Sequence, residues 1–186
     1  MAGGMIAAHS HCGLQMAPQI VLRTYSYRFA EQVLNANLSI RQEIEAILKD
    51  VSLPIPELSR PRFNQELDRR FVEKGWQPQP LVFGEPGEPM AKMDFLKGRV
   101  GIEVEFGHSS FLGIDLLKMQ IGSYSGLDKI DIGIYVVTTS AFQQRMSADF
   151  SANWEGSLKF EKVIRYLPYF KSAIQVPIFV YGIDIV

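Results

Sequence analysis

The fold of this chain is decided by the stretch Met93-Asp-Phe-Leu-Lys-Gly-Arg-Val-Gly-Ile-Glu103-Val-Glu105-Phe106. It contains two short apolar-rich segments, 93–96 and 100–106, separated by Gly98. This pattern predicts a β-hairpin. A two-residue loop, Gly98-Arg99, has Gly at the first central position, as a type II′ turn requires. We therefore expect two antiparallel strands joined at residues 98 and 99.

The expected turn also sets which residues face each other. Residue 97 lies opposite residue 100, so Asp94 lies opposite Glu103 with Cβ atoms about 5 Å apart. Glu105 follows two positions later on the same face, because side chains alternate along a strand. The other face of the second strand carries apolar residues: Ile102, Val104 and Phe106. Three carboxylates are therefore predicted to converge on the face opposite the core.

Converging carboxylates need a compensating positive charge, because like charges placed opposite each other destabilise a strand pair. One solution is a bound divalent ion. Oxygen ligands without cysteine or histidine nearby favour Mg²⁺, with Mn²⁺ as a substitute, and such ions serve phosphodiester chemistry. The alternative is that basic neighbours neutralise the acids on a solvated sheet face: Lys92, Lys97 and Arg99. The spacing alone leaves both interpretations open.

Outside the hairpin, apolar periodicity predicts further helices and strands. Helical patterns occupy residues 27–51, with Ser39 as the N-cap of a second helix there, and residues 64–76, 111–124 and 154–167. Runs rich in β-branched residues at 130–137 and 176–183 predict strands, and Pro177 can stand only at a strand's start or edge. Helices around a small mixed sheet indicate an α/β (α+β) fold.

The length and composition suit one globular domain. The chain has 186 residues, 47% of them hydrophobic, and a formal net charge of −1 that gives no general argument for nucleic-acid binding. Its apolar runs are shorter than the ~20 residues of a membrane span, so we expect no membrane partner. The single cysteine, Cys12, favours a reducing cytoplasm. We expect residues 1–15 to be a flexible extension and residues 16–186 to form the catalytic domain.

The residues around the hairpin resemble those of a known family. Residues 93–111 are similar to the active-site segment of the BglII/BstYI family of type II restriction endonucleases, in the PD-(D/E)XK nuclease superfamily. The resemblance is closer to BstYI, and it continues through residues 115–117, 128–134, 154–156 and 176–183. It implies a restriction-endonuclease-like core, with a mixed central sheet flanked by helices.

The resemblance implies a homodimer that hydrolyses both strands of a short palindromic site in double-stranded DNA, centred on GATC, and leaves 5′-phosphates. A companion DNA methyltransferase is implied as well. Asp94 and Glu103 match metal-binding carboxylates, and Val104 matches a residue whose carbonyl binds the metal. Glu105 matches the third catalytic position, where the superfamily pattern has Lys and the close relatives have Gln. Its role, as a general base or as a group that orders water, stays open.

The resemblance also indicates DNA contacts, for which Ser, Asn and His side chains are suitable. The candidates are Asn64, His108, Ser109, Ser110, Ser147, Ser151 and Asn153. Asn64 could equally be an ordinary residue at a helix N-terminus, and His108 an ordinary surface residue. Residues 147–153 match a loop near the major groove in relatives. The helix that opens with Asp115 and Lys118 is expected to face the partner subunit.

Two other functions stay open at the level of the sequence. One is a sequence-specific DNA-binding protein on an inactive nuclease scaffold, which the presence of all three carboxylates disfavours. The other is a repair or junction nuclease on the same core, which would select DNA by shape rather than by sequence.

Overall fold

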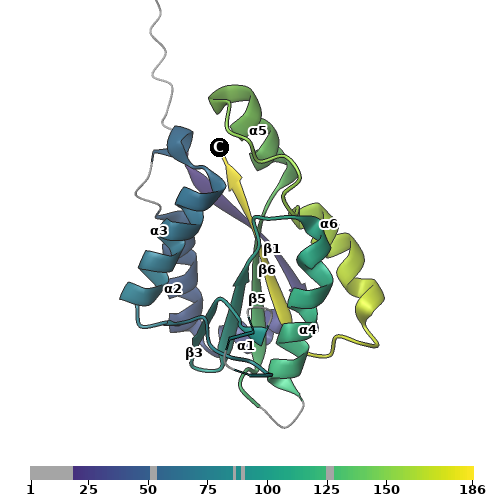
Figure 1. The fold of residues 1–186 in the computed structure, drawn as a ribbon. Helices are drawn as coiled ribbons and strands as arrows, with labels where there is room; N and C mark the ends of the chain where they lie inside the picture. The colour runs from purple at the N-terminus through teal and green to yellow at the C-terminus, as the bar shows by residue number, and fades with distance from the viewer. Residues whose placement is uncertain (1–18, 51–53, 86, 89–90, 125–127) are drawn as a thin grey trace, which may run out of the picture.

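The described part of the chain is built around one mixed β-sheet with helices on both faces (Figure 1). The computed structural model describes residues 19–50, 54–85, 87–88, 91–124 and 128–186. The expected extension, residues 1–15, lies outside the described residues. The sheet has six strands in the order β1-β6-β5-β4-β3-β2. The predicted α/β (α+β) class is confirmed.

The centre of the sheet is parallel and its flanks are antiparallel. The strands are β1 Ile20–Tyr27, β2 Gln77–Pro78, β3 Phe95–Lys97, β4 Val100–Val104, β5 Ile132–Thr138 and β6 Ile178–Ile185. β4, β5 and β6 run parallel, whereas β1 pairs antiparallel with β6 and β3 with β4. Every residue of β5 and β6 is buried, as expected for parallel strands covered on both faces. Both strands were predicted, and Pro177 directly precedes β6.

The helices form a layer on each face of the sheet. They are α1 Ala30–Asn35, α2 Leu38–Lys49, α3 Arg60–Glu73, α4 Leu112–Ser123, α5 Ser140–Phe150 and α6 Phe160–Tyr166, with short 3₁₀ helices η1 Ile55–Glu57, η3 Ser109–Phe111 and η4 Leu167–Phe170. α2 and α3 lie on one side, and α4 and α6 on the other (Figure 1). Among the described residues, no helix is both long and apolar enough to cross a membrane.

Each face of the sheet has its own hydrophobic core. Ile134 and Val136 of β5 belong to the core shared with α1, α2 and α3. Tyr135 and Val137, which alternate with them, belong to the core shared with α4 and α6. The aromatic centre of the first core includes Phe106, which is completely buried. Because both faces are packed, the sheet is a firm platform for side chains at its strand ends.

The hairpin has the predicted register. Phe95 pairs with Ile102, and Lys97 pairs with Val100. Ile102 and Phe106 are buried in the first core, so the apolar face of the second strand points where the alternation predicts. The boundaries are tighter than the sequence suggested, since β3 begins at residue 95 and β4 ends at residue 104.

The turn type differs from the expected type II′. Gly98 and Arg99 have φ values of 52° and 65°, and positive φ at both central residues defines a type I′ turn. Arg99 is a rare residue for this conformation. Its guanidinium donates to both oxygens of Asp131, with Nε–Oδ2 at 2.9 Å and Nη2–Oδ1 at 2.7 Å. These contacts offset the backbone strain and explain why the expectation was wrong.

The segment 27–51, for which a helical pattern was predicted, contains the last residue of a strand as well as two helices. Tyr27 ends β1, and the helices begin at Ala30 and Leu38. The N-cap of α2 is Asn37, so the prediction that Ser39 caps this helix is wrong. β1 was not predicted, because it is stabilised by pairing with β6 at the other end of the chain. Local periodicity does not report such a contact.

The helix predicted over 154–167 begins only at Phe160. Trp154 is completely buried, and its indole N–H donates to the carbonyl of Leu58 at 2.8 Å. Its ring also packs edge-on against Phe142, with centroids 4.9 Å apart. These tertiary contacts hold the segment before α6 in an irregular conformation. The periodicity also missed α5, so Ser147 lies in a helix and not in the expected loop.

Candidate active site

Asp94 lies at the entry to the hairpin, immediately before β3. The regular pairing of β3 with β4 stops at Phe95, so Asp94 and Glu103 do not form a ladder pair. Instead, Asp94 Oδ2 accepts a hydrogen bond from the N–H of Val104 at 2.8 Å. Burial raises the pKa of Asp94, and this hydrogen bond opposes the shift. The carboxylate is thus held against the end of β4.

Gln79 holds the other oxygen of Asp94. Its Nε2 donates to Asp94 Oδ1 at 3.1 Å, and its backbone N–H donates to the carbonyl of Asp94 at 2.9 Å. The backbone of Gln79 has a φ of 48°, a left-handed conformation that is uncommon outside glycine. The Pro-rich sequence around this residue has no pattern that would have identified its role.

Glu103 is the most deeply buried of the three predicted carboxylates, at 3% exposure. Its Oε1 lies 2.7 Å from Lys118 Nζ, but the geometry is that of an ion pair, and this oxygen accepts no well-formed hydrogen bond among the described residues. Burial and the nearby charge of Asp94 raise the pKa of Glu103 to about 9, while Lys118 acts in the opposite direction.

Lys118 and Asp115 lie behind the carboxylates. Lys118 Nζ is 3.1 Å from Asp115 Oδ1, and Asp115 Oδ2 accepts a hydrogen bond from the Tyr135 hydroxyl at 2.9 Å. Asp115 and Lys118 are 4% and 8% exposed, so these two residues of α4 face the protein interior, and the expectation that the helix faces a partner subunit stays a prediction. The sequence did contain a signal, because Leu116 and Met119 beside them are core residues. A charged pair inside an apolar helix face indicates a buried pair.

Glu105 lies just past the end of β4. Its backbone N–H donates to the carbonyl of Val136 at 2.9 Å, which continues the pairing with β5. Its Oε1 accepts a hydrogen bond from the N–H of Gly107. Burial, followed by the charge of Asp115, raises the pKa of Glu105 to about 7. This carboxyl group can therefore exchange a proton near neutral pH.

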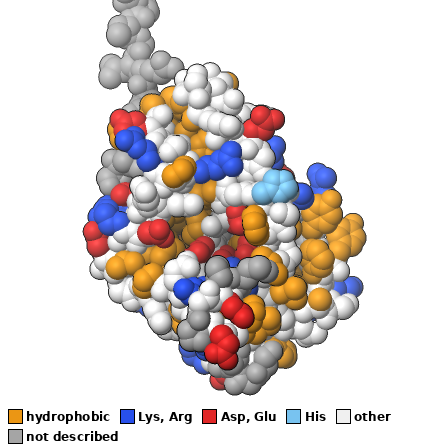
Figure 2. Space-filling model, viewed as in Figure 1, with side chains coloured by type: hydrophobic (Ala, Val, Ile, Leu, Met, Phe, Trp, Pro, Cys, Tyr) orange, Lys and Arg blue, Asp and Glu red, His pale blue; other side chains and the backbone are white. Residues whose placement is uncertain are grey.

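An open cavity lies beside Asp94. It has an empty volume of about 380 Å³ and is lined by Asn64, Leu67, Asp68, Gln79, Asp94, Phe95 and Val104. Acidic side chains are visible in a hollow between the helical layers (Figure 2). Asn64 reaches this cavity from α3, which begins four residues before it, so it is not the N-terminal residue of the helix. The structure thus brings Asn64 to the same cavity as Asp94.

Two of the three basic residues that the alternative required pair with other acids. Lys97 pairs with Glu43 at 2.7 Å, and Arg99 pairs with Asp131. Among the described residues, no three His, Cys, Asp or Glu side chains are grouped as a metal site. The oxygen donors available at the hairpin are the carboxylates of Asp94 and Glu103 and the carbonyl of Val104.

The predicted DNA contacts lie on surface loops and helix ends. His108 caps η3, where its Nδ1 accepts from the N–H of Ser110 at 3.3 Å. Ser109 Oγ accepts from Lys162 Nζ at 2.8 Å. Ser147, Ser151 and Asn153 are exposed on α5 and the segment after it. No hydrogen bond reported for the described residues joins any of these side chains to the three carboxylates.

Comparisons with known proteins bear on the same segment. The family model described as restriction endonuclease BglII/BglIII matches residues 22–183. This chain belongs to the BglII/BglIII restriction endonuclease family. The match includes the three carboxylates and the candidate DNA contacts of Asn64, His108 and α5. As a member of the BglII/BglIII family, the chain is a site-specific DNA nuclease.

Two solved structures have the same fold. One, described as restriction endonuclease BglII complexed with a DNA 16-mer, is 19% identical with a TM-score of 0.66, and the match covers 87% of this chain and 77% of that chain. The other, free BglII, is 19% identical with a TM-score of 0.58, over 87% of this chain and 78% of that chain. A comparison with curated protein sequences gave no match.

Proposed function

We propose that this BglII/BglIII family member is a metal-dependent type II restriction endonuclease that hydrolyses both strands of a short palindromic DNA site centred on GATC and leaves 5′-phosphates. One observation carries the proposal: Asp94 lines an open cavity and accepts a hydrogen bond from the backbone of Val104, which stands between Glu103 and Glu105 in the sequence. The resemblance of residues 93–111 to the family's active-site segment supports these roles.

The residues present fit a divalent cation. Glu103 Oε1 is a buried oxygen that contacts Lys118 but accepts no well-formed hydrogen bond among the described residues, and burial raises the pKa of Asp94 and of Glu103. Asp94, Glu103 and the carbonyl of Val104 would hold Mg²⁺, with Mn²⁺ as a substitute. The ion would supply activation of water and neutralisation of charge on the phosphate.

Glu105 is the proposed third catalytic group. The N–H of Gly107 donates to one of its oxygens and so fixes the carboxyl group just past the end of β4. With a pKa of about 7, the carboxylate is able to accept a proton from water near neutral pH. A carboxylate at this position therefore suits a general base as well as a group that only orders water.

DNA recognition is assigned to the side chains predicted from the resemblance. His108 caps η3, and Ser109 and Ser110 are its first two residues, a few positions after Glu105 in the chain. All three are candidates for base or phosphate contacts. Ser147, Ser151 and Asn153 on the α5 side are candidates for reading base edges, and Asn64 for approaching the scissile phosphate. The structure of BglII complexed with DNA supports double-stranded DNA as the partner.

We further propose a homodimer, since a palindromic site has two equivalent halves. An exposed apolar groove between α4 and η4, lined by Leu117 and Phe170 among others, supports a contact surface there. A cytoplasmic location and a companion DNA methyltransferase follow from the role of such enzymes in restriction systems. Sedimentation of the pure protein tests the dimer, and a neighbouring methyltransferase gene tests the companion.

The decisive experiment is digestion of a plasmid of known sequence in Mg²⁺, followed by sequencing of the fragment ends. We expect discrete fragments with 5′-phosphates at one GATC-centred palindrome, and no cleavage by Glu103→Gln. Glu57→Gln, which changes an exposed carboxylate paired with Arg62, is the matched control and should cleave normally. Intact DNA across Mg²⁺ and Mn²⁺ concentrations, together with tight site-specific binding, would instead indicate an inactive nuclease scaffold. Cleavage governed by DNA shape would indicate a repair or junction nuclease.

A further inference from the structure

Lys118 is a buried cation directed at the catalytic carboxylates. Its side chain is 10% exposed, and its Nζ lies 2.7 Å from Glu103 Oε1 and 3.1 Å from Asp115 Oδ1. It also donates to the carbonyl of Lys92 at 3.2 Å. A buried ammonium group is costly unless it is paired, and these three oxygens lie within 3.2 Å of Lys118 Nζ. Lys118 is therefore fixed beside Glu103 rather than turned towards solvent.

Asp115 is anchored by Tyr135 of strand β5. The hydroxyl of Tyr135 donates to Asp115 Oδ2, and Tyr135 is completely buried in β5. In the parallel pairing of β4 with β5, Tyr135 stands next to Glu103. The chain of contacts from Tyr135 through Asp115 and Lys118 to Glu103 thus joins α4 to both strands. Such a closed network fixes the orientation of each member.

The position of Lys118 has an electrostatic consequence. Glu103 and Asp115 lie next to Lys118, and the charges of Asp94 and Asp115 act on Glu103. Without a further cation, the ammonium group is the counter-charge that makes their burial tolerable. A divalent ion bound to Glu103 would share that carboxylate with Lys118 and would be repelled by it.

We propose that Lys118 is a positioning residue that serves as an internal counter-ion, holding Glu103 in place before the metal binds and then competing with the metal for that carboxylate. Asp115 and Tyr135 keep Lys118 in this position. The inference rests on the proposed metal dependence. It explains why a lysine and an aspartate are buried in a helix whose neighbouring residues are apolar.

The test compares Lys118→Met with the wild-type protein by thermal unfolding in EDTA and in MnCl₂, and by calorimetric titration with Mn²⁺. The variant should unfold at a lower temperature in EDTA, because the buried carboxyl groups of Glu103 and Asp115 lose the ammonium group with which both are in contact. Mn²⁺ should restore most of that loss and should bind at least about tenfold more tightly, since a like charge has been removed from beside its site.

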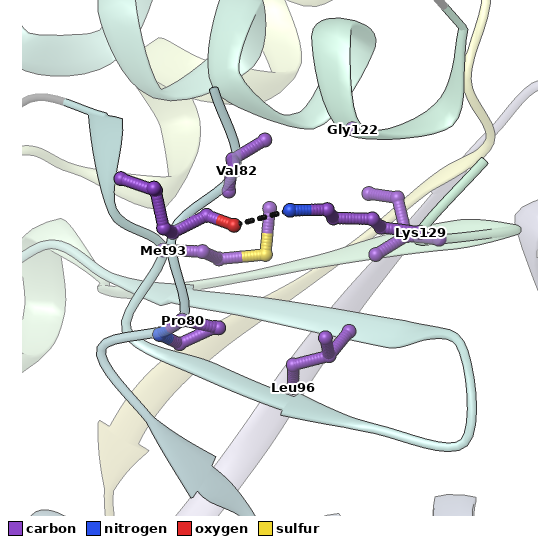
Figure 3. A pocket seen from close by; sticks show the side chains of 8 residues that line it. Pro80, Val82, Met93, Leu96, Gly122 and Lys129 are labelled. Carbon is purple, nitrogen blue, oxygen red and sulfur yellow. Dashed lines mark hydrogen bonds between the residues drawn. The ribbon is translucent and has the colours of Figure 1, made fainter. Parts of the chain in front are cut away.

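Lys129→Met is the matched control. Lys129 is also partly buried, but its Nζ donates to the carbonyl of Leu81 at 2.6 Å, in a pocket beside Met93 and Val82 (Figure 3). Its loss should lower the unfolding temperature equally in EDTA and in Mn²⁺, with unchanged Mn²⁺ affinity. The same pattern in Lys118→Met would show a merely structural role and would overturn the proposal.

A second variant covers the case in which Lys118→Met does not fold. Tyr135→Phe removes only the hydroxyl that anchors Asp115, and it should show a smaller gain in Mn²⁺ affinity, with the same sign. Unchanged or weaker Mn²⁺ binding in that variant overturns the proposal. If the wild-type protein binds no Mn²⁺, the proposed metal dependence fails as well, whereas wild-type binding without a change in the variants overturns the role of Lys118 alone.

Discussion

The backbone N–H of Val104 donates a hydrogen bond to Asp94 Oδ2 at 2.8 Å. This bond crosses the hairpin, from the strand that carries Glu103 and Glu105 to the residue that precedes the other strand. It fixes the first acid to the backbone between the other two. The position of the Asp94 carboxylate therefore depends on the backbone of β4, whereas Lys118 contacts Glu103 and the N–H of Gly107 holds Glu105.

Asp94→Asn should abolish function and yet preserve the fold. The amide keeps an oxygen for the Val104 N–H, and the side-chain amide of Gln79 can turn its own oxygen towards the new NH₂ group. The change also removes a negative charge beside Glu103, whose pKa that charge raises. We expect cleavage to fall by at least about 10²-fold. In EDTA, the unfolding temperature should equal or exceed that of the wild type, because repulsion is relieved. A clear loss of stability in EDTA would contradict this account of the site.

Gly107→Ala should displace Glu105. A Cβ at Gly107 would lie 2.7 Å from Glu105 Oε1, and the flexible carboxylate end would move away at little cost in stability. A shift of this kind in a catalytic group costs about 10²-fold in rate. Glu57→Gln, which changes an exposed carboxylate paired with Arg62, is the control and should cleave normally. Normal cleavage by Gly107→Ala would remove Glu105 from the mechanism.

The metal-free protein should lose stability as pH rises. The pKa of Glu103 is about 9 in the folded protein, against an ordinary value of 4.5, so the folded state holds a proton that the unfolded chain has released. The stability that this bound proton contributes is fully present below the ordinary glutamate pKa of 4.5. It is lost as the pH rises to the pKa of the folded protein, that is, from about pH 5 to about pH 9. Thermal unfolding in EDTA across this range measures it. Glu103→Gln should flatten the profile, and a profile identical to the wild type would contradict the assignment.

Phe106→Ala should destabilise the end of β4. Phe106 is 1% exposed and stacks on Phe63 with ring centroids 5.0 Å apart. Removing a buried phenyl ring costs about 3–5 kcal/mol in the free energy of unfolding. Tyr169→Ala is the control, because Tyr169 is 81% exposed and its loss should change stability by less than about 0.5 kcal/mol. Urea denaturation of both variants gives the comparison.

The C-terminal half shows where local patterns mislead. The sequence around Trp154 has helical spacing, but its indole N–H is satisfied by the carbonyl of Leu58, 96 positions away in the chain. Burial of that ring in an aromatic cluster decides the local conformation. In the same way, Arg99 adopts a positive φ because Asp131, from the segment before β5, holds its guanidinium.

The hairpin and its register were determined by the sequence itself. A two-residue turn and the alternation of apolar and acidic side chains act between near neighbours, so Lys97 pairs with Val100 and Phe95 with Ile102, as predicted. Only the tertiary structure decided which basic side chain lies next to these acidic residues. Lys118 reaches Glu103 from a helix on one face of the sheet, and Gln79 reaches Asp94 from a Pro-rich loop. Contacts between distant segments depend on how whole layers pack, and local sequence carries no record of that packing.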